Sequence, residues 1–162
     1  SRMNTRALFG LSILMSFVAF GLITNLYIWP QLHVVSPSSA LTALVAIHMY
    51  RFVGLGFLVP GVTSPTLPPA FAGPAAWGNL VAAILALVAT VALRADASWA
   101  LVAVWIFNSW GAADLLYAMV NGPRRLAPAG PGSLAAMYFI PTLVVPALLV
   151  THGLIFWVLL HT

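Results

Sequence analysis

Five long apolar segments dominate this chain of 162 residues. They lie at about residues 7–29, 38–60, 75–94, 98–121 and 134–161. A helix of about 20 apolar residues can cross a hydrocarbon layer about 30 Å thick, and a helix satisfies its own backbone hydrogen bonds in lipid. The pattern therefore predicts an all-α, polytopic membrane protein. We expect a bundle of five transmembrane helices that forms a single domain over residues 1–162.

The composition agrees with a lipid environment. Hydrophobic residues make up 62% of the chain and charged residues 5%, whereas a soluble domain has about 25% charged residues. The chain contains no cysteine, which excludes disulfides and cysteine-ligated zinc or iron–sulfur centres. The basic residues are few and scattered, so nucleic acid is not an expected partner. The expected partners are membrane lipids and a small hydrophobic ligand.

Proline and glycine mark the ends of the predicted helices. Pro30 and Pro37 bracket the first connection, and the run Asn121-Gly122-Pro123 is expected to end the fourth helix. Residues 60–74 are rich in proline and carry no charge. Because proline lacks an N–H group and restricts its preceding residue, this segment is expected to be an irregular loop. A stiff connection is the favoured interpretation, and a lid over a cavity is the alternative.

The arginines predict how the bundle is oriented. Arg2 and Arg6 precede the first apolar segment, and Arg124 and Arg125 follow the fourth. With five spans, all four fall on one side of the membrane, while Arg94 falls on the other side close to an acidic residue. Basic residues are enriched in cytoplasmic loops. We therefore expect the N-terminus inside and the C-terminus outside, in the inner (plasma) membrane of a bacterial cell.

Two charged residues, Arg51 and Asp114, lie well inside the predicted spans, and His48, Asn108 and His152 fall near the middles of three of them. Such groups are costly in hydrocarbon, so they are expected to face the interior of the bundle and to be paired. At about 1.5 Å per residue, His48, Asn108 and His152 fall in one layer, and Arg51 and Asp114 in another. We predict a polar site between the second, fourth and fifth helices, with Arg51 and Asp114 paired directly or through one water.

The favoured function is the binding of a small hydrophobic or amphipathic ligand in this site. Trp105 and Trp110 lie deep in the fourth helix beside Asn108, and we expect them to form apolar walls together with Tyr50 and Phe107. The polar side chains would orient the ligand. The predicted ligand-binding residues are His48, Arg51, Trp105, Asn108, Trp110, Asp114 and His152.

Other functions stay open at this point. His48 and His152 on different helices could be the two axial ligands of a haem b that transfers electrons. With Asp114, the same histidines could form a proton or ion pathway or a small transporter. Five spans in one chain are few for a transporter, so this alternative requires a homo-oligomer. An enzyme acting on a lipid substrate is a further alternative. No catalytic motif and no metal-ligand spacing is present, so no catalytic or metal-binding residue is assigned. A structural accessory subunit is the last possibility.

Overall fold

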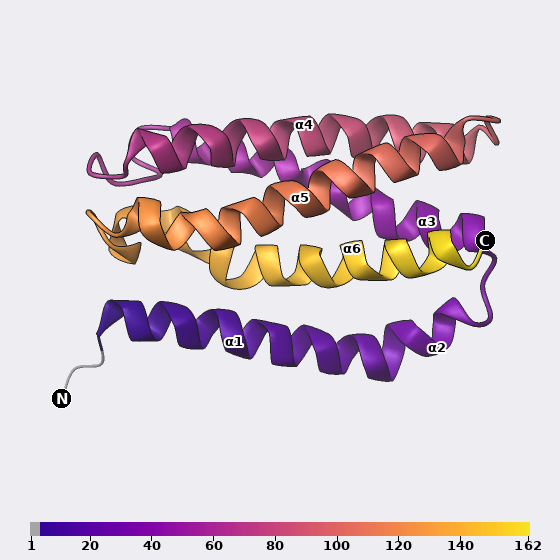
Figure 1. The fold of residues 1–162 in the computed structure, drawn as a ribbon, viewed down its shortest axis with the longest axis horizontal. Coiled ribbons are helices and arrows are strands. Elements are labelled where there is room, and N and C mark those ends of the chain that lie inside the picture. Colours follow the sequence, from indigo (N-terminus) through magenta and orange to yellow (C-terminus); the bar gives the residue numbers. More distant parts are fainter. Residues whose placement is uncertain (1–3) are drawn as a thin grey trace.

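The computed structural model describes residues 4–162, which leaves Arg2 outside the described residues (Figure 1). These residues are largely helical and include no strand. The elements are α1 (Thr5–Ile23), the π-helix η1 (Thr24–Ile28), α2 (Trp29–Leu32), α3 (Pro37–Ala46), the 3₁₀-helix η2 (Ile47–Leu58), α4 (Pro69–Arg94), α5 (Ala100–Leu126), the 3₁₀-helix η3 (Pro131–Tyr138), the π-helix η4 (Ile140–Val144) and α6 (Val145–Leu160). Five helical stretches are long and apolar enough to cross a membrane. The predicted all-α fold with five such helices is confirmed.

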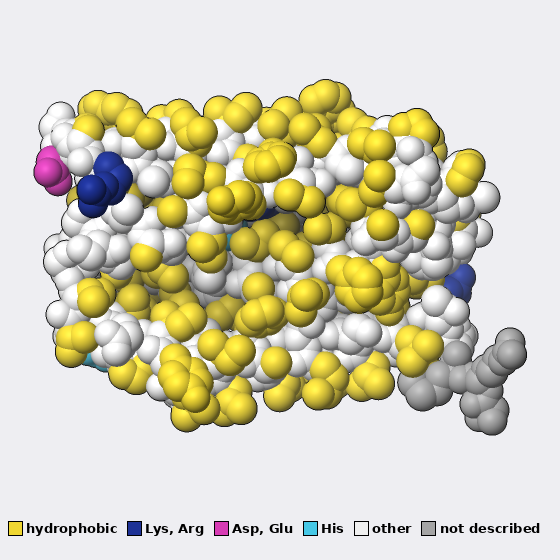
Figure 2. Space-filling model, turned by 180° about the vertical axis from the view of Figure 1, so that it is seen from behind, with side chains coloured by type: hydrophobic (Ala, Val, Ile, Leu, Met, Phe, Trp, Pro, Cys, Tyr) yellow, Lys and Arg dark blue, Asp and Glu magenta, His cyan; other side chains and the backbone are white. Residues whose placement is uncertain are grey.

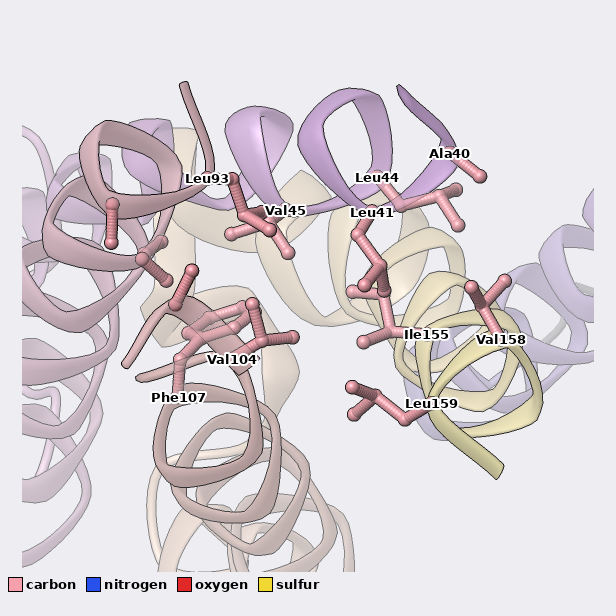
Figure 3. Packing of buried hydrophobic residues seen from close by; sticks show 14 of the residues in the cluster. Ala40, Leu41, Leu44, Val45, Leu93, Val104, Phe107, Ile155, Val158 and Leu159 are labelled. Carbon is pink, nitrogen blue, oxygen red and sulfur yellow. The ribbon is translucent and has the colours of Figure 1, made fainter. Parts of the chain in front are cut away.

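The long helices lie side by side along the longest axis of the molecule (Figure 1). α1 lies at one edge, where it packs on α6 and η4, and α4 packs on η2, α3 and α5. The N- and C-terminal ends of the chain lie at opposite ends of the bundle (Figure 1). One apolar core joins α3, α4, α5 and α6, and Leu41, Val45, Phe107 and Ile155 are buried in it (Figure 3).

The second long helix changes its type halfway, which the prediction of one α-helix over 38–60 did not include. α3 ends at Ala46, and the chain continues as the 3₁₀-helix η2, which is 12 residues long. A 3₁₀-helix has three residues per turn, so residues three apart lie in line. The buried residues of η2 follow this spacing, and they are His48, Arg51, Gly54 and Phe57. The helix type therefore aligns the histidine and the arginine on one buried face.

The third long helix, α4, begins at Pro69 instead of residue 75. Proline is favoured in the first turn of a helix, where its missing N–H group would have no helical acceptor. The predicted proline-rich loop is therefore shorter than 60–74. It is packed against η3, because the Ser64 amide donates to the Ser133 carbonyl at 3.0 Å and the Ala136 amide to the Val62 carbonyl at 3.2 Å.

The fourth long helix, α5, continues past its predicted end at Asn121-Gly122-Pro123 and reaches Leu126. Gly122 has no positive φ, and a Cβ on it would lie 3.4 Å from the Phe71 ring. The glycine therefore serves a close approach to α4 and does not turn the chain. The added turn carries Arg125, whose Nη1 donates to the Ala70 carbonyl at 3.2 Å. Pro74 denies that carbonyl its usual α-helical donor.

The last predicted helix, 134–161, is broken near its start. η3 contains Ala135 at a φ of 48°, and the helix is continuous only from Ile140 through η4 and α6. Pro146 has no N–H group for the Thr142 carbonyl. The Ser16 hydroxyl of α1 donates to this carbonyl at 2.5 Å. Ser16 is the one buried residue of α1, so this bond anchors the most peripheral helix to the bundle.

Replacing Ser16 by alanine should lower the free energy of unfolding by about 1–3 kcal/mol, because the Thr142 carbonyl then lacks a donor. Ser12→Ala is the control, since that hydroxyl bonds only within α1 to the Leu8 carbonyl, and its effect should stay below about 0.5 kcal/mol. Thermal unfolding in detergent measures both. In a Pro146→Ala background the restored N–H group supplies the carbonyl, so Ser16→Ala should cost less there. An equal cost in both backgrounds would contradict this explanation.

Candidate functional site

The Arg51 guanidinium is the centre of a buried hydrogen-bonded cluster. Its side chain is 1% exposed, and Nη2 donates to Asp114 Oδ2 at 2.7 Å. Nη1 donates to the Gly111 carbonyl and to His152 Nε2, both at 3.2 Å, and Nε donates to Asn79 Oδ1 at 2.9 Å. The predicted pairing of Arg51 with Asp114 is confirmed. One side chain of η2 thus contacts polar groups of α4, α5 and α6.

The hydrogen bonds determine where His152 carries its proton. An arginine side chain has no acceptor, so His152 Nε2 must accept from Arg51. The proton therefore lies on His152 Nδ1, which donates to Asn108 Oδ1 at 2.6 Å. Asn108 Nδ2 donates in return to the His152 backbone carbonyl at 3.2 Å. His152 is neutral, and its ring is held between an arginine and an asparagine.

His48 has the opposite tautomer. The Thr151 hydroxyl donates to the Leu148 carbonyl at 2.8 Å, so it can only accept from His48. His48 Nε2 therefore carries the proton and donates to Thr151 Oγ1 at 2.9 Å. His48 Nδ1 is buried and has no hydrogen-bond partner within residues 4–162. A second proton there would bury an unpaired N–H group, so His48 is also neutral.

The two histidine rings pack against each other, which does not fit the haem alternative. Their centroids are 4.3 Å apart at an angle of 47° between the planes, and Phe107 packs on both rings at 5.1 and 5.4 Å. Two axial ligands must approach iron from opposite faces of a porphyrin, and rings in contact leave no space for one. Both Nε2 atoms also bond to protein groups. This arrangement therefore does not fit a haem with His48 and His152 as its two axial ligands.

Glycines on three helices give the polar side chains their space. A Cβ on Gly54, Gly78 or Gly111 would lie closer than 3.0 Å to Asn79, Asp114 or His152, respectively. Small residues let helix backbones approach closely. At these three positions the space is filled by the polar cluster.

Asn79 is the member of the cluster that the sequence analysis missed. It comes from α4, so the site includes the third long helix as well as the second, fourth and fifth. Its Nδ2 donates to the Ala75 carbonyl at 2.7 Å. The predicted helix start at residue 75 placed Asn79 near a helix end, where an amide needs no explanation. The true start at Pro69 puts it well inside the helix. The sequence did contain a signal for Asn79, because a single amide side chain within an alanine-rich apolar segment indicates a buried polar site.

The predicted aromatic walls are not present around the cluster. Trp105 is 38% exposed and Trp110 is 46% exposed, while Tyr50 is 69% exposed. The buried residues of α5 form a stripe that includes Phe107, Asn108 and Gly111. The two tryptophans are not among the buried residues of α5 and lie on its exposed surface. Of the predicted walls, Phe107 packs on the two histidines, and Tyr50 lines a groove beside Arg51.

A groove beside Arg51 takes the place of the predicted enclosed pocket. It has a volume of about 190 Å³ and lies between η2 and the segment formed by η4 and α6. Arg51 and Asn79 line it together with Ile47, Tyr50, Val53, Gly54, Ile140, Val144, Val145 and Leu148. Figure 2 shows the face behind the view of Figure 1, where the hydrophobic surface is hollowed near its middle. The groove thus brings the polar cluster next to an apolar, laterally open space.

Asp114→Asn should destabilise the protein, because it leaves the Arg51 charge buried without its counter-ion. Removing one partner of a buried pair costs about 3–5 kcal/mol, and we expect the lower end because the Asp114 side chain is 15% exposed. Asp96→Asn is the matched control, since Asp96 is exposed and forms no ion pair with any described residue. Melting temperatures in detergent compare the two variants. Equal melting temperatures would refute a stabilising role for the pair.

The described residues contain no group of three or more His, Cys, Asp or Glu that could hold a metal ion. No curated protein and no solved structure matches the chain. A family model described as "Domain of unknown function (DUF8737)" matches residues 8–160, and the chain therefore belongs to this family.

Proposed function

We propose that the chain is an integral membrane protein whose lateral groove binds a small, uncharged amphipathic molecule. Five helices of sufficient length and apolar character support membrane insertion. The arginines support the orientation with the N-terminus inside, because Arg6, Arg124 and Arg125 lie at one end of the bundle and Arg94 at the other. In a bacterial cell this corresponds to the inner membrane.

The observation that carries the proposal is the groove beside Arg51 and Asn79. An apolar cavity of about 150 Å³ takes up a molecule of the size of benzene, so a groove of about 190 Å³ has room for a guest with a ring. Its walls are mainly aliphatic, and its polar groups are few. Small-molecule sites typically combine apolar walls with a small number of polar groups that orient the ligand.

The charges and hydrogen bonds of the cluster favour an uncharged ligand with an acceptor atom. Arg51 is neutralised by Asp114, and an anionic ligand would have to displace that carboxylate. Arg51 has five N–H groups, and its four hydrogen bonds to described residues leave one of them. Asn79 Nδ2 likewise has a second N–H group beyond its bond to Ala75. A carbonyl, ether or hydroxyl oxygen would match these donors.

The same cluster favours binding over proton transfer and over catalysis. Arg51 lies between Asp114 and His152, and a guanidinium keeps its protons in proteins. A relay from the carboxylate to the histidine would therefore stop at Arg51. His48 is 0% exposed and His152 is 1% exposed, and neither lines the groove. No general base thus faces the space where the ligand would lie.

Photolabelling with benzophenone tests the proposal, since this probe has one ring that the groove can hold, a second ring that can extend through its open side, one carbonyl acceptor and a photoreactive group. We expect radiolabelled benzophenone to label peptides of η2 and η4 in the purified protein. Val144→Trp fills the groove and should abolish this labelling. Leu143→Trp is the control, because Leu143 is 48% exposed and does not line the groove. Equal labelling of the two variants would contradict a site in the groove.

A competition experiment tests the role of the polar donors. Diphenylmethane has the same two rings as benzophenone but no carbonyl group. A hydrogen bond from a charged donor contributes about 1.5–3 kcal/mol, so diphenylmethane should compete for labelling at least about tenfold less well than unlabelled benzophenone. Equal competition by the two compounds would show that Arg51 and Asn79 do not orient the guest.

A further inference from the structure

The net positive charge of the chain is concentrated at one end. The formal charge of +4 is the sum of six arginines and two aspartates. The positive charge of Arg51 is cancelled by Asp114, with which it forms an ion pair. In the sum of formal charges, Arg94 is cancelled by Asp96, which lies close to it in the sequence. Of the four remaining arginines, three lie in the described part of the chain, and they are Arg6, Arg124 and Arg125. Asp96 precedes α5, so about 40 Å of helix separates it from the arginines at the other end of α5.

These arginines come together from two helices that are far apart in the sequence. Arg6 of α1 donates through Nη2 to the Ala127 carbonyl at 3.0 Å, at the C-terminal end of α5. Arg125 donates to Tyr117 Oη, and its guanidinium lies over that ring at 5.0 Å. The Arg124 side chain is exposed and forms no hydrogen bond or ion pair with any residue in 4–162. Its charge is therefore available to a ligand.

A narrow apolar groove begins beside this basic end. Phe9 and Ile13 of α1 line one side, starting one turn after Arg6, and Met119, Pro123 and Leu126 of α5 line another. The lining of α5 extends from Leu126 back to Leu115, which is about 16 Å of helix. The volume is about 70 Å³, which is small for a ring system that needs about 150 Å³. An extended hydrocarbon chain can lie along this length with one side in the groove and the other side outside it.

The packing of α1 explains why such a groove exists. Ser16 is the one residue of α1 that the rest of the chain buries. Two side-chain hydrogen bonds join α1 to later parts of the described chain, from Ser16 to the Thr142 carbonyl and from Arg6 to the Ala127 carbonyl. The described residues leave an open groove lined by both α1 and α5. A lipid chain in this space would join the peripheral helix to the bundle.

We propose that this groove holds one acyl chain of an anionic phospholipid, with its phosphate bound by Arg6 and Arg124. Arginine binds phosphate through charge-assisted hydrogen bonds, and anionic lipids are attracted to basic residues at the membrane surface. The site rests on the membrane insertion proposed above. It does not depend on the ligand of the groove beside Arg51.

Native mass spectrometry in mixed micelles of phosphatidylglycerol and phosphatidylcholine with equal chains tests the site. We expect one phosphatidylglycerol molecule to be retained in preference to phosphatidylcholine. The preference should fall about fivefold for each arginine replaced in Arg6→Gln and Arg124→Gln. Arg94→Gln, at the opposite end, should leave it unchanged. Because the Arg124 side chain makes no hydrogen bond to the described protein, the Arg124→Gln variant should fold normally. An unchanged preference for phosphatidylglycerol in this variant would overturn the proposal.

The acyl-chain part of the site has its own test. Ala118 lines the groove, so Ala118→Leu should reduce the retained phosphatidylglycerol. Ala103→Leu is the control, since Ala103 lines a separate apolar hollow of about 190 Å³ that shares no lining residue with this groove. An excess of inorganic phosphate should not displace the lipid, and displacement by phosphate alone would overturn the proposal. The two grooves share Asn79, Ile140 and Val145 in their linings, so the variant that separates them must lie elsewhere. Ile47→Trp, at a residue that lines only the groove beside Arg51, should leave lipid retention intact, so a failure of one site can be told from a failure of the other.

Discussion

The buried guanidinium of Arg51 is the group on which the arrangement of the helices depends. It belongs to η2, and it bonds to Asn79 of α4, to Asp114 and the Gly111 carbonyl of α5, and to His152 of α6. A buried charge without partners costs several kcal/mol, so any shift of one of these helices that broke the contacts would be strongly unfavourable. The cluster therefore sets the relative positions of four helices whose remaining contacts are largely apolar.

The 3₁₀ conformation of η2 is what makes this cluster geometrically possible. In an α-helix, residues three apart are offset by about 60° around the axis, whereas in a 3₁₀-helix they lie in line. His48 and Arg51 can therefore face α5 and α6 together. Long 3₁₀ segments have poorer hydrogen-bond geometry than α-helices. The bonds of the aligned polar side chains offset this local cost, and the glycines beside them let the backbones come close enough.

The parts of the structure that were predictable are those that follow from the cost of polar groups in an apolar environment. Hydropathy and segment length predict the five helices, and the opposite charges of Arg51 and Asp114 predict their pairing. Features that depend on helix ends and on rotation about the helix axis were not predictable in the same way. An error of a few residues at the start of α4 concealed Asn79. Trp105 and Trp110 were expected at the site, but the face on which a tryptophan lies depends on the packing of α5 against its neighbours. The contact between His48 and His152 depends on the helix type of η2, which no simple pattern indicates.

The tautomers of the two buried histidines test the central claim most directly, since they report the direction of the hydrogen bonds that join the rings to Thr151, Arg51 and Asn108. The chain has four histidines, so a His33→Gln/His161→Gln variant leaves His48 and His152 as the only ones. Nitrogen NMR of this variant, labelled with ¹⁵N-histidine in detergent micelles at neutral pH, should show two neutral imidazoles. One should carry its proton on Nδ1, as His152 does, and the other on Nε2, as His48 does. A positively charged ring, or two rings of the same tautomer, would contradict a closed, neutral cluster centred on Arg51.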